Sequence, residues 1–260
     1  MVKPFWGKIM EITSVNNETI KEVAKLQQKK YRDDSKKFLL EGLKAIEEAF
    51  NADIEIEQIF VLKEKAFHYS FLEEKIVYVT EPVLKKLSTT DSAPDAVAVG
   101  KQKIYDISCL KNAKRIALFE NIKDLGNLGT ILRTATAFSL DGIILYGNTV
   151  DLYNPKCVRA SVGNLWKTPV IQLKDFSNLQ EYFKDYTRIA TLPKSEDSIY
   201  LKDFKPQDKI LVMFGAEADG LSQELINFAT DKVTIEMDNK VESLNLSMSA
   251  GIIFYKLFLL

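Results

Sequence analysis

Short apolar runs alternate with segments of mixed polarity along the second half of the chain. The run at 211–214 stops at a glycine, which is typical of a buried parallel strand. Similar runs lie at 115–119, 142–146, 188–191 and 233–235, and segments with helical spacing separate most of them. Strands that alternate with helices in this way predict an α/β fold with a mostly parallel sheet.

The first hundred residues also combine short apolar runs, typical of strands, with segments of helical spacing. Apolar side chains recur at helical intervals over 19–28, 42–50 and 81–87, which predicts three helices. The other expected elements are strands at 38–42, 54–62, 75–79 and 96–99, and a polar loop at 31–37. We therefore expect a small α/β domain over 1–105, a linker at 106–113 and a larger domain over 114–260.

Polar residues gather directly after two of the predicted strands in the larger domain. Glu217 follows the strand at 211–214, and Ser243 and Asn245 come after the last predicted strand. Because ligands of open α/β sheets bind at the carboxyl ends of strands, we expect these loops to form one site. Gly215 would allow a ligand to approach the backbone closely, and Ser243 is expected to cap the last helix.

Composition limits the class of protein and its chemistry. The chain has 260 residues, of which 46% are hydrophobic and 27% charged, and its formal net charge is −1, as is ordinary for a globular protein. Cys109 and Cys157 are far apart and His68 is the single histidine, so we expect no disulfide framework, no His-based triad and no metal site. No stretch reaches ~18 consecutive apolar residues, so we expect no membrane span and a cytoplasmic location.

The segment 21–44 is locally basic although the whole chain is not. It holds eight lysine and arginine residues and four acidic ones. Such a run is usually a solvated helix face, but Tyr31 and Phe38 add an aromatic ring on each side of its centre, which favours RNA. The candidate RNA contacts are Lys29, Lys30, Arg32, Lys36 and Lys37.

Three polar, glycine-containing segments of the larger domain belong together. They are DLGNLGTILRTATAF at 124–138, FGAEADGLS at 214–222 and ESLNLSMSAGI at 242–252. In content, order and spacing they resemble the three motifs of the SpoU/TrmH class of RNA ribose 2′-O-methyltransferases, in the SPOUT superfamily. Less specifically, KKFLLEGLKAIEEAF at 36–50 and SAPDAVAVG at 92–100 resemble the RNA substrate-binding domain, itself like a ribosomal protein, that is often fused to these enzymes.

This resemblance implies a fold and a cofactor. The C-terminal domain is expected to form a deep trefoil knot, an exception to the rule against threaded chains. It is also expected to bind S-adenosylmethionine, largely through backbone groups at strand ends. The implied cofactor contacts are Thr191, Leu192, Gly215, Ile235 and Leu244. Without the resemblance, Ile235 and Leu244 would be interpreted as ordinary core residues.

The implied catalytic positions all carry polar side chains: Asn127, Arg133, Glu217, Ser243 and Asn245. Without the resemblance, Glu217 would be a surface carboxylate and Ser243 a helix cap. Arg133 lies on a helix predicted to face inward, where a guanidinium needs partners. The resemblance implies that Arg133 contacts the target 2′-hydroxyl or a flanking phosphate, often from the partner subunit of a dimer. Because a guanidinium keeps its proton at neutral pH, we expect Arg133 to orient the ribose and stabilise negative charge rather than act as a base.

Together these inferences predict a homodimeric methyltransferase that acts on a ribose 2′-hydroxyl, with structured rRNA favoured over tRNA. The last predicted helix ends IIFYKLFLL, more apolar than an exposed amphipathic helix, which favours dimerisation there; burial within the monomer is the alternative. Two other functions stay open. One is a non-catalytic RNA-binding or assembly protein on a retired methyltransferase fold, and the other is a nicotinamide-dependent oxidoreductase. The turn GNLG lacks the G-x-G-x-x-G spacing that the oxidoreductase requires.

Overall fold

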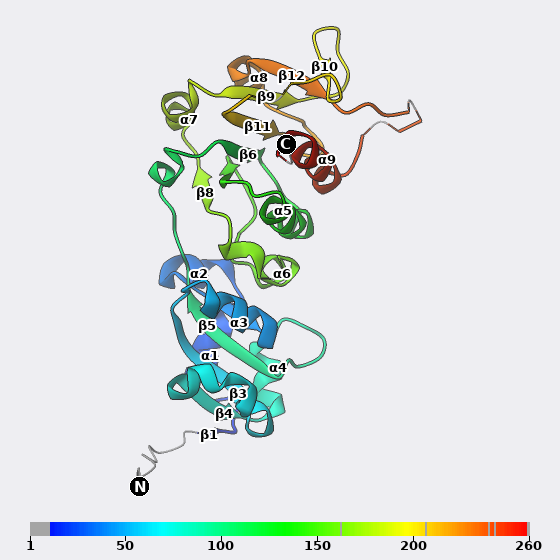
Figure 1. Cartoon of the computed structure of the whole chain (residues 1–260). Helices are drawn as coiled ribbons and strands as arrows, with labels where there is room; N and C mark the ends of the chain where they lie inside the picture. Colours follow the sequence, from blue (N-terminus) through cyan, green and yellow to red (C-terminus); the bar gives the residue numbers. More distant parts are fainter. Residues whose placement is uncertain (1–10, 162, 206, 239, 242, 259–260) are drawn as a thin grey trace. The chain divides into compact units, whose positions relative to one another are not determined.

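The computed structural model describes residues 11–161, 163–205, 207–238, 240–241 and 243–258, which divide into two units (Figure 1). The first unit consists of the described residues up to Lys103 together with Tyr153–Gly163. The second consists of Ile104–Leu152 and the described residues from Asn164 onward. The chain therefore leaves the second unit after Leu152, adds a short segment to the first unit, and returns.

The first unit is built on one sheet. Its strands are β1 (Glu11–Ile12), β2 (Lys37–Glu41), β3 (Ile56–Leu62), β4 (Ile76–Val79) and β5 (Ala96–Lys101). Its helices are α1 (Glu18–Lys25), α2 (Lys29–Ser35), α3 (Leu43–Asn51), α4 (Glu81–Leu87) and α6 (Pro155–Ala160), with 3₁₀ turns η1 over Lys63–Lys75. The strand order is β1-β4-β3-β5-β2, with β5 antiparallel to both of its neighbours. Apolar side chains of α1 and α4 pack on this sheet.

Helix α2 occupies the segment for which the sequence predicts a polar loop, so that prediction is wrong. Arg32 in this helix is 1% exposed, and its Nη1 donates a 2.6 Å hydrogen bond to the carbonyl oxygen of Leu26, just after α1. The helix ends at Ser35, and the next residue, Lys36, caps it in a left-handed conformation with φ of 55°. Packing of a long side chain into the core thus imposes a helix on a segment whose local composition does not favour one.

Polar contacts fix the returning segment Tyr153–Gly163 to the rest of the first unit. The Tyr153 hydroxyl accepts a hydrogen bond from the backbone nitrogen of Lys103 (2.8 Å) and donates one to its carbonyl oxygen (2.7 Å). Arg159 Nη1 lies 3.0 Å from Glu41 Oε1, and the Glu41 side chain is 3% exposed. Removal of Arg159 would leave a buried carboxylate without its charged partner, so this contact ties the segment firmly.

The second unit is a seven-stranded sheet in which every strand pair is parallel. Its strands are β6 (Arg115–Glu120), β7 (Gly142–Tyr146), β8 (Val170–Leu173), β9 (Thr187–Thr191), β10 (Ile199–Tyr200), β11 (Ile210–Phe214) and β12 (Asp231–Thr234). Its helices are α5 (Leu125–Ala137), α7 (Phe176–Phe183), α8 (Gln223–Phe228) and α9 (Leu246–Phe258), with 3₁₀ turns η2 (Ile107–Leu110) and η3 (Asn164–Trp166). The order β10-β12-β9-β11-β6-β7-β8 confirms the predicted α/β class and is compatible with the implied knot.

Helices cover both faces of this sheet (Figure 1). Alternate side chains of β6 and β11 pack with α7 and α8 on one face, and α5 and α9 pack together on the other. There the ring of Phe254 in α9 stands edge-on to Phe119 and Phe214, with centroids 6.5 and 5.9 Å away. Phe119 and Phe214 stack on each other at 4.9 Å. Each such pair stabilises the fold by about 0.5–1.5 kcal/mol beyond the stabilisation that comes from its buried apolar area. The cluster therefore holds α9 near the carboxyl ends of β6 and β11.

Two further findings concern the described part of the chain. No helix in it has both the length and the apolar character needed to cross a bilayer. Nor do three His, Cys, Asp or Glu side chains come together in it in a way that could hold a metal ion.

Candidate active site

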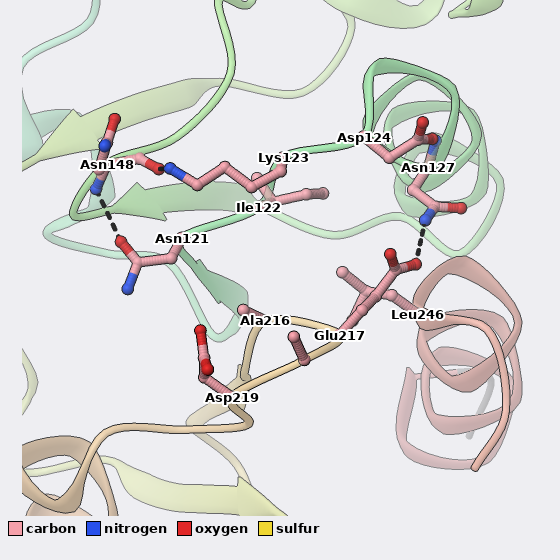
Figure 2. A pocket seen from close by; sticks show the side chains of 11 residues that line it. Asn121, Ile122, Lys123, Asp124, Asn127, Asn148, Ala216, Glu217, Asp219 and Leu246 are labelled. Carbon is pink, nitrogen blue, oxygen red and sulfur yellow. Dashed lines mark hydrogen bonds between the residues drawn. The ribbon is translucent and has the colours of Figure 1, made fainter.

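A cavity of about 400 Å³ lies at the carboxyl ends of three neighbouring strands of the second unit. The loop after β6 supplies residues 121–124, the loop after β7 supplies Asn148, and the loop after β11 supplies residues 216–219. Asn127 of α5 and Leu246 of α9 complete its lining (Figure 2). This is the edge of the sheet at which the sequence places the site.

A chain of side-chain hydrogen bonds joins three polar residues at this cavity. Asn127 Nδ2 donates to Glu217 Oε1 at 2.5 Å, and Asn127 Oδ1 accepts from Asn245 Nδ2 at 3.0 Å (Figure 2 shows the first bond). Asn245 Oδ1 in turn accepts from the backbone nitrogen of Ser247 at 2.9 Å, and so caps the start of α9. Each of the three residues comes from a different sequence motif, and the structure brings them together as the sequence predicts.

The loop after β11 folds back tightly on itself. Backbone hydrogen bonds join Ala216 and Gly220 in both directions, at 3.1 and 2.9 Å, and Gly220 is left-handed with φ of 67°. A Cβ atom on Gly215 would lie 2.0 Å from the carbonyl carbon of Gly220. The chain's own backbone therefore occupies the position that a side chain at residue 215 would take, so the fold of the loop requires glycine here, and the cofactor contact at Gly215 stays a prediction.

A second set of polar contacts joins α8, the helix that follows this loop, to the ends of β6 and β7. The backbone nitrogen of Ser222, at the start of α8, donates a 2.7 Å hydrogen bond to Glu120 Oε2, and Glu120 is only 4% exposed. The Tyr146 hydroxyl donates to Glu224 Oε2 at 3.1 Å. Burial, reinforced by that hydrogen bond, raises the pKa of Tyr146 to about 12, so the phenol remains a donor at neutral pH.

Four of the five implied cofactor contacts lie on neighbouring parts of the sheet edge. Thr191 and Leu192 are at the end of β9, Gly215 follows β11 and Ile235 follows β12, and these three strands are adjacent. Leu244 lies between β12 and α9, and all five residues are partly exposed. Partly exposed aliphatic side chains beside strand-end backbone groups suit an adenine ring and its polar edge, so these residues fit S-adenosylmethionine. The cavity described above touches none of the five.

Two implied catalytic residues lie elsewhere than the sequence argument suggested. Arg133 is exposed on α5 rather than facing inward, does not line the cavity, and makes no hydrogen bond or ion pair with the described residues. Its position six residues after the buried Asn127 places it on another side of the helix. Ser243 is exposed and does not cap α9, which begins at Leu246 with Asn245 as its cap.

The candidate RNA contacts of the first unit differ in exposure. Lys29, Lys30 and Lys36 are exposed, and Lys37 pairs with Glu57 at 2.7 Å. Arg32 is buried and bonded to backbone, as described above, so its interpretation as an RNA contact is wrong. Its guanidinium serves the packing of α2.

Sequence reasoning missed several residues that line or support the cavity: Glu120, Asn121, Lys123, Asp124, Asn148 and Asp219. Glu217 was identified because it is a polar residue directly after a predicted buried strand, and the same pattern could have identified several of these residues. Glu120, Asn121 and Asn148 also follow apolar runs that end at the same edge of the sheet.

Comparison with known proteins gives a consistent result over nearly the whole chain. Residues 114–255 match the SpoU rRNA Methylase family, and residues 17–98 match the MRM3-like substrate binding domain. The chain is 32% identical to an uncharacterized tRNA/rRNA methyltransferase of Synechocystis sp., over 97% of this chain and 95% of that protein. It is 26% identical to the 23S rRNA (guanosine(2553)-2′-O)-methyltransferase of Bacillus subtilis, over 95% and 98%. The AdoMet-bound rRNA methyltransferase from Sinorhizobium meliloti superimposes with a TM-score of 0.86 at 25% identity, covering 96% of this chain and 97% of that one.

The tight loop after Gly215 yields a stability prediction. Gly215→Ala forces a Cβ into the Gly220 backbone, so we expect the free energy of unfolding to fall by about 1–3 kcal/mol, measured by chemical denaturation. Gly251→Ala in α9 is the matched control, because its Cβ would meet only Thr134 Cγ2 at 3.7 Å. There we expect no loss, or a gain of about 0.5–1 kcal/mol from the helix. Equal stability of Gly215→Ala and the wild type would show that the space is open.

Proposed function

The chain belongs to the SpoU rRNA methylase family, and on that premise we propose that it methylates the 2′-oxygen of a ribose in ribosomal RNA, in the cytoplasm. It is an S-adenosylmethionine-dependent methyltransferase. The observation that carries the proposal is the hydrogen-bonded chain Glu217–Asn127–Asn245 beside an open cavity. A protein that only binds RNA has no need for three polar side chains aligned in this way, so the arrangement supports catalysis.

The chemistry requires activation of a weak nucleophile. S-Adenosylmethionine supplies an electrophilic methyl group when it is bound, and Thr191, Leu192 and Ile235 are among the residues proposed to hold it. Asn127 fixes one carboxylate oxygen of Glu217, which leaves Oε2 without a hydrogen bond among the described residues. That oxygen is placed to accept a hydrogen bond from the ribose and so to orient it.

Arg133 supplies the positive charge that the developing oxyanion needs. Because it is exposed and lies outside the cavity of its own subunit, we propose that it acts on RNA held at the interface with a second copy of the chain. In that position it orients the ribose or a flanking phosphate with its planar fork of donors.

Substitution of Arg133 tests this role. We expect Arg133→Ala to bind S-adenosylmethionine as the wild type does, and to lose on the order of 10²-fold or more in methyl transfer, because a charge-stabilising donor is removed. Arg133→Lys should recover little, since a point charge lacks the planar fork. Calorimetry measures the binding, and transfer of a radiolabelled methyl group to unmodified rRNA transcripts measures the rate. A rate for Arg133→Ala near that of the wild type contradicts the assignment.

The exposed face of α9 supports a homodimer. Met248, Ile252 and Tyr255 recur at intervals of four and three, and are 59%, 38% and 60% exposed. They form one apolar stripe along the helix. Tyr255 also contacts Phe138, which caps the C-terminal end of α5, with ring centroids 6.0 Å apart, so the stripe reaches the end of the helix that bears Arg133. An apolar surface of this kind is typical of a protein interface. The inner face of the same helix, at Phe254 and Phe258, is buried in the monomer.

Hydrodynamic measurement tests the dimer. The chain has a mass of 29.6 kDa, so we expect sedimentation at micromolar concentration to give a species of twice that mass. Ile252→Glu places a charge in the stripe and should produce monomers and lower methyl transfer together. Ile104→Glu is the control, because Ile104 is an exposed apolar residue (69%) outside both helices. A wild-type monomer with full activity contradicts the proposal.

We also propose that the first unit captures RNA through the exposed lysines of α2 and its C-terminal end. Replacement of Lys29, Lys30 and Lys36 together by Ala should weaken RNA binding and reduce the slope of log K against log salt by about 2–3, since each phosphate contact contributes about 0.7–0.9. Replacement of Lys21 and Lys25, which pair with Glu18 and Glu22, is the control and should change the slope less. An unchanged slope in the triple variant argues against this surface.

A further inference from the structure

The cavity extends beyond the Asn127–Glu217 pair to a second group of polar side chains. Asn121, Lys123 and Asn148 lie together in Figure 2, away from that pair. They come from the loops after β6 and β7, which are neighbours in the sheet. Asp219 also lines the cavity, from the loop after β11. None of these residues has a role in the scheme described above.

The side chain of Asn121 is held in one orientation by its surroundings. Its Oδ1 accepts a 2.8 Å hydrogen bond from the backbone nitrogen of Asn148. A Cβ on Gly147 would lie 2.6 Å from that same oxygen, and Gly147 has φ of 78°. Asn121 itself is left-handed with φ of 52°. Two unusual backbone conformations in adjacent loops thus converge on one amide, and such strain is often found at functional sites.

This arrangement fixes the chemistry that Asn121 offers. Because Oδ1 must accept from a backbone N–H, the other amide atom is Nδ2, a donor. In Figure 2 it is directed away from Asn148, toward Asp219, and it has no hydrogen-bond partner among the described residues. Lys123 Nζ donates to the carbonyl oxygen of Asn148 at 2.5 Å, so its ammonium is held at Asn148, the residue from which Asn121 Nδ2 is directed away (Figure 2). The cavity therefore presents the Asn121 Nδ2 donor on the side that bears the carboxylate of Asp219 (Figure 2).

The remaining lining argues for a nucleobase rather than a phosphate. Asp124, Glu217 and Asp219 are acidic and Lys123 is the basic residue of the lining, so the cavity repels an anion. Ile122, Ala216, Ala218 and Leu246 also line it, which suits the faces of a flat ring. A volume of about 400 Å³ is within the usual range for a small-molecule pocket.

We propose that this end of the cavity is a base-binding subsite that favours guanine as the base of the methylated nucleotide. Guanine has an acceptor, O6, next to two donors, N1–H and the 2-amino group. Asn121 Nδ2 donates to O6, and the Asp219 carboxylate accepts from N1–H and the amino group, which adenine cannot match. This inference rests on the proposed function, since the ribose of the same nucleotide must lie at Glu217.

The nucleoside product tests the inference against the proposed function. The full-length protein, S-adenosylmethionine and unmodified rRNA transcripts are incubated, and the RNA is digested to nucleosides for mass spectrometry. We expect 2′-O-methylguanosine. A different 2′-O-methylnucleoside overturns the base assignment while the proposed function stands. Absence of any ribose methylation overturns the proposed function instead.

Substitutions test the residues. Asn121→Asp keeps the oxygen that Asn148 requires and replaces the donor by an acceptor, so we expect methyl transfer to fall by about tenfold to a hundredfold. Asn227→Asp makes the same chemical change on the exposed surface of α8 and should leave transfer unchanged. Equal losses in both variants, or in neither, overturn the role of Asn121. A loss that comes with a changed salt dependence assigns the site to a phosphate and also overturns the proposal.

A binding measurement needs no methyl transfer. The uncharged nucleosides guanosine and inosine differ only by the 2-amino group, from which the Asp219 carboxylate is proposed to accept a hydrogen bond. We expect the wild type to bind guanosine several-fold more tightly than inosine by NMR titration, and Asp219→Asn to bind the two alike. No preference in the wild type overturns the proposal even if the enzyme's RNA target is not found.

Discussion

The side-chain amide of Asn127 is the constraint on which the active-site geometry depends. It is 9% exposed, donates to Glu217 and accepts from Asn245, whose own oxygen caps α9. Loss of any partner would leave a largely buried polar atom unpaired. The start of α5, the loop after β11 and the start of α9 are therefore held in one arrangement, although Asn127 and Asn245 are 118 residues apart in sequence.

The two faces of α9 explain why one apolar helix can serve both the core and the surface. Phe254 packs edge-on against the stacked rings of Phe119 and Phe214 and fixes the helix to the sheet. On the other side, the stripe from Met248 to Tyr255 stays exposed in the monomer. The sequence argument treated dimerisation and burial as alternatives, whereas the helix is apolar enough for one face to be buried and the other to be available for a partner.

The sequence predicted the parallel sheet, most elements and the meeting of Asn127, Glu217 and Asn245, because apolar periodicity and motif order carry that information. It failed where a distant contact decides the conformation. Arg32 is buried in helix α2, where its guanidinium donates to the carbonyl oxygen of Leu26. Local spacing also could not place Arg133 on the exposed side of α5, since helix rotation is set by packing on the sheet and on α9. Asn121 escaped notice for the same reason, because its orientation depends on the next loop.

The segment Tyr153–Gly163 has a consequence for synthesis of the protein. The first unit includes residues up to Lys103, but the Arg159 that pairs with its buried Glu41 belongs to a segment that ends only at Gly163. At a translation rate of ~5–20 residues per second, the ribosome delivers that last piece roughly 3 to 12 seconds after the main part of the unit. During this interval the Glu41 carboxylate lacks its cationic partner, while the first strands of the second unit have already been made. The N-terminal unit therefore cannot reach its final structure as an independent early product, and it matures together with the beginning of the catalytic sheet.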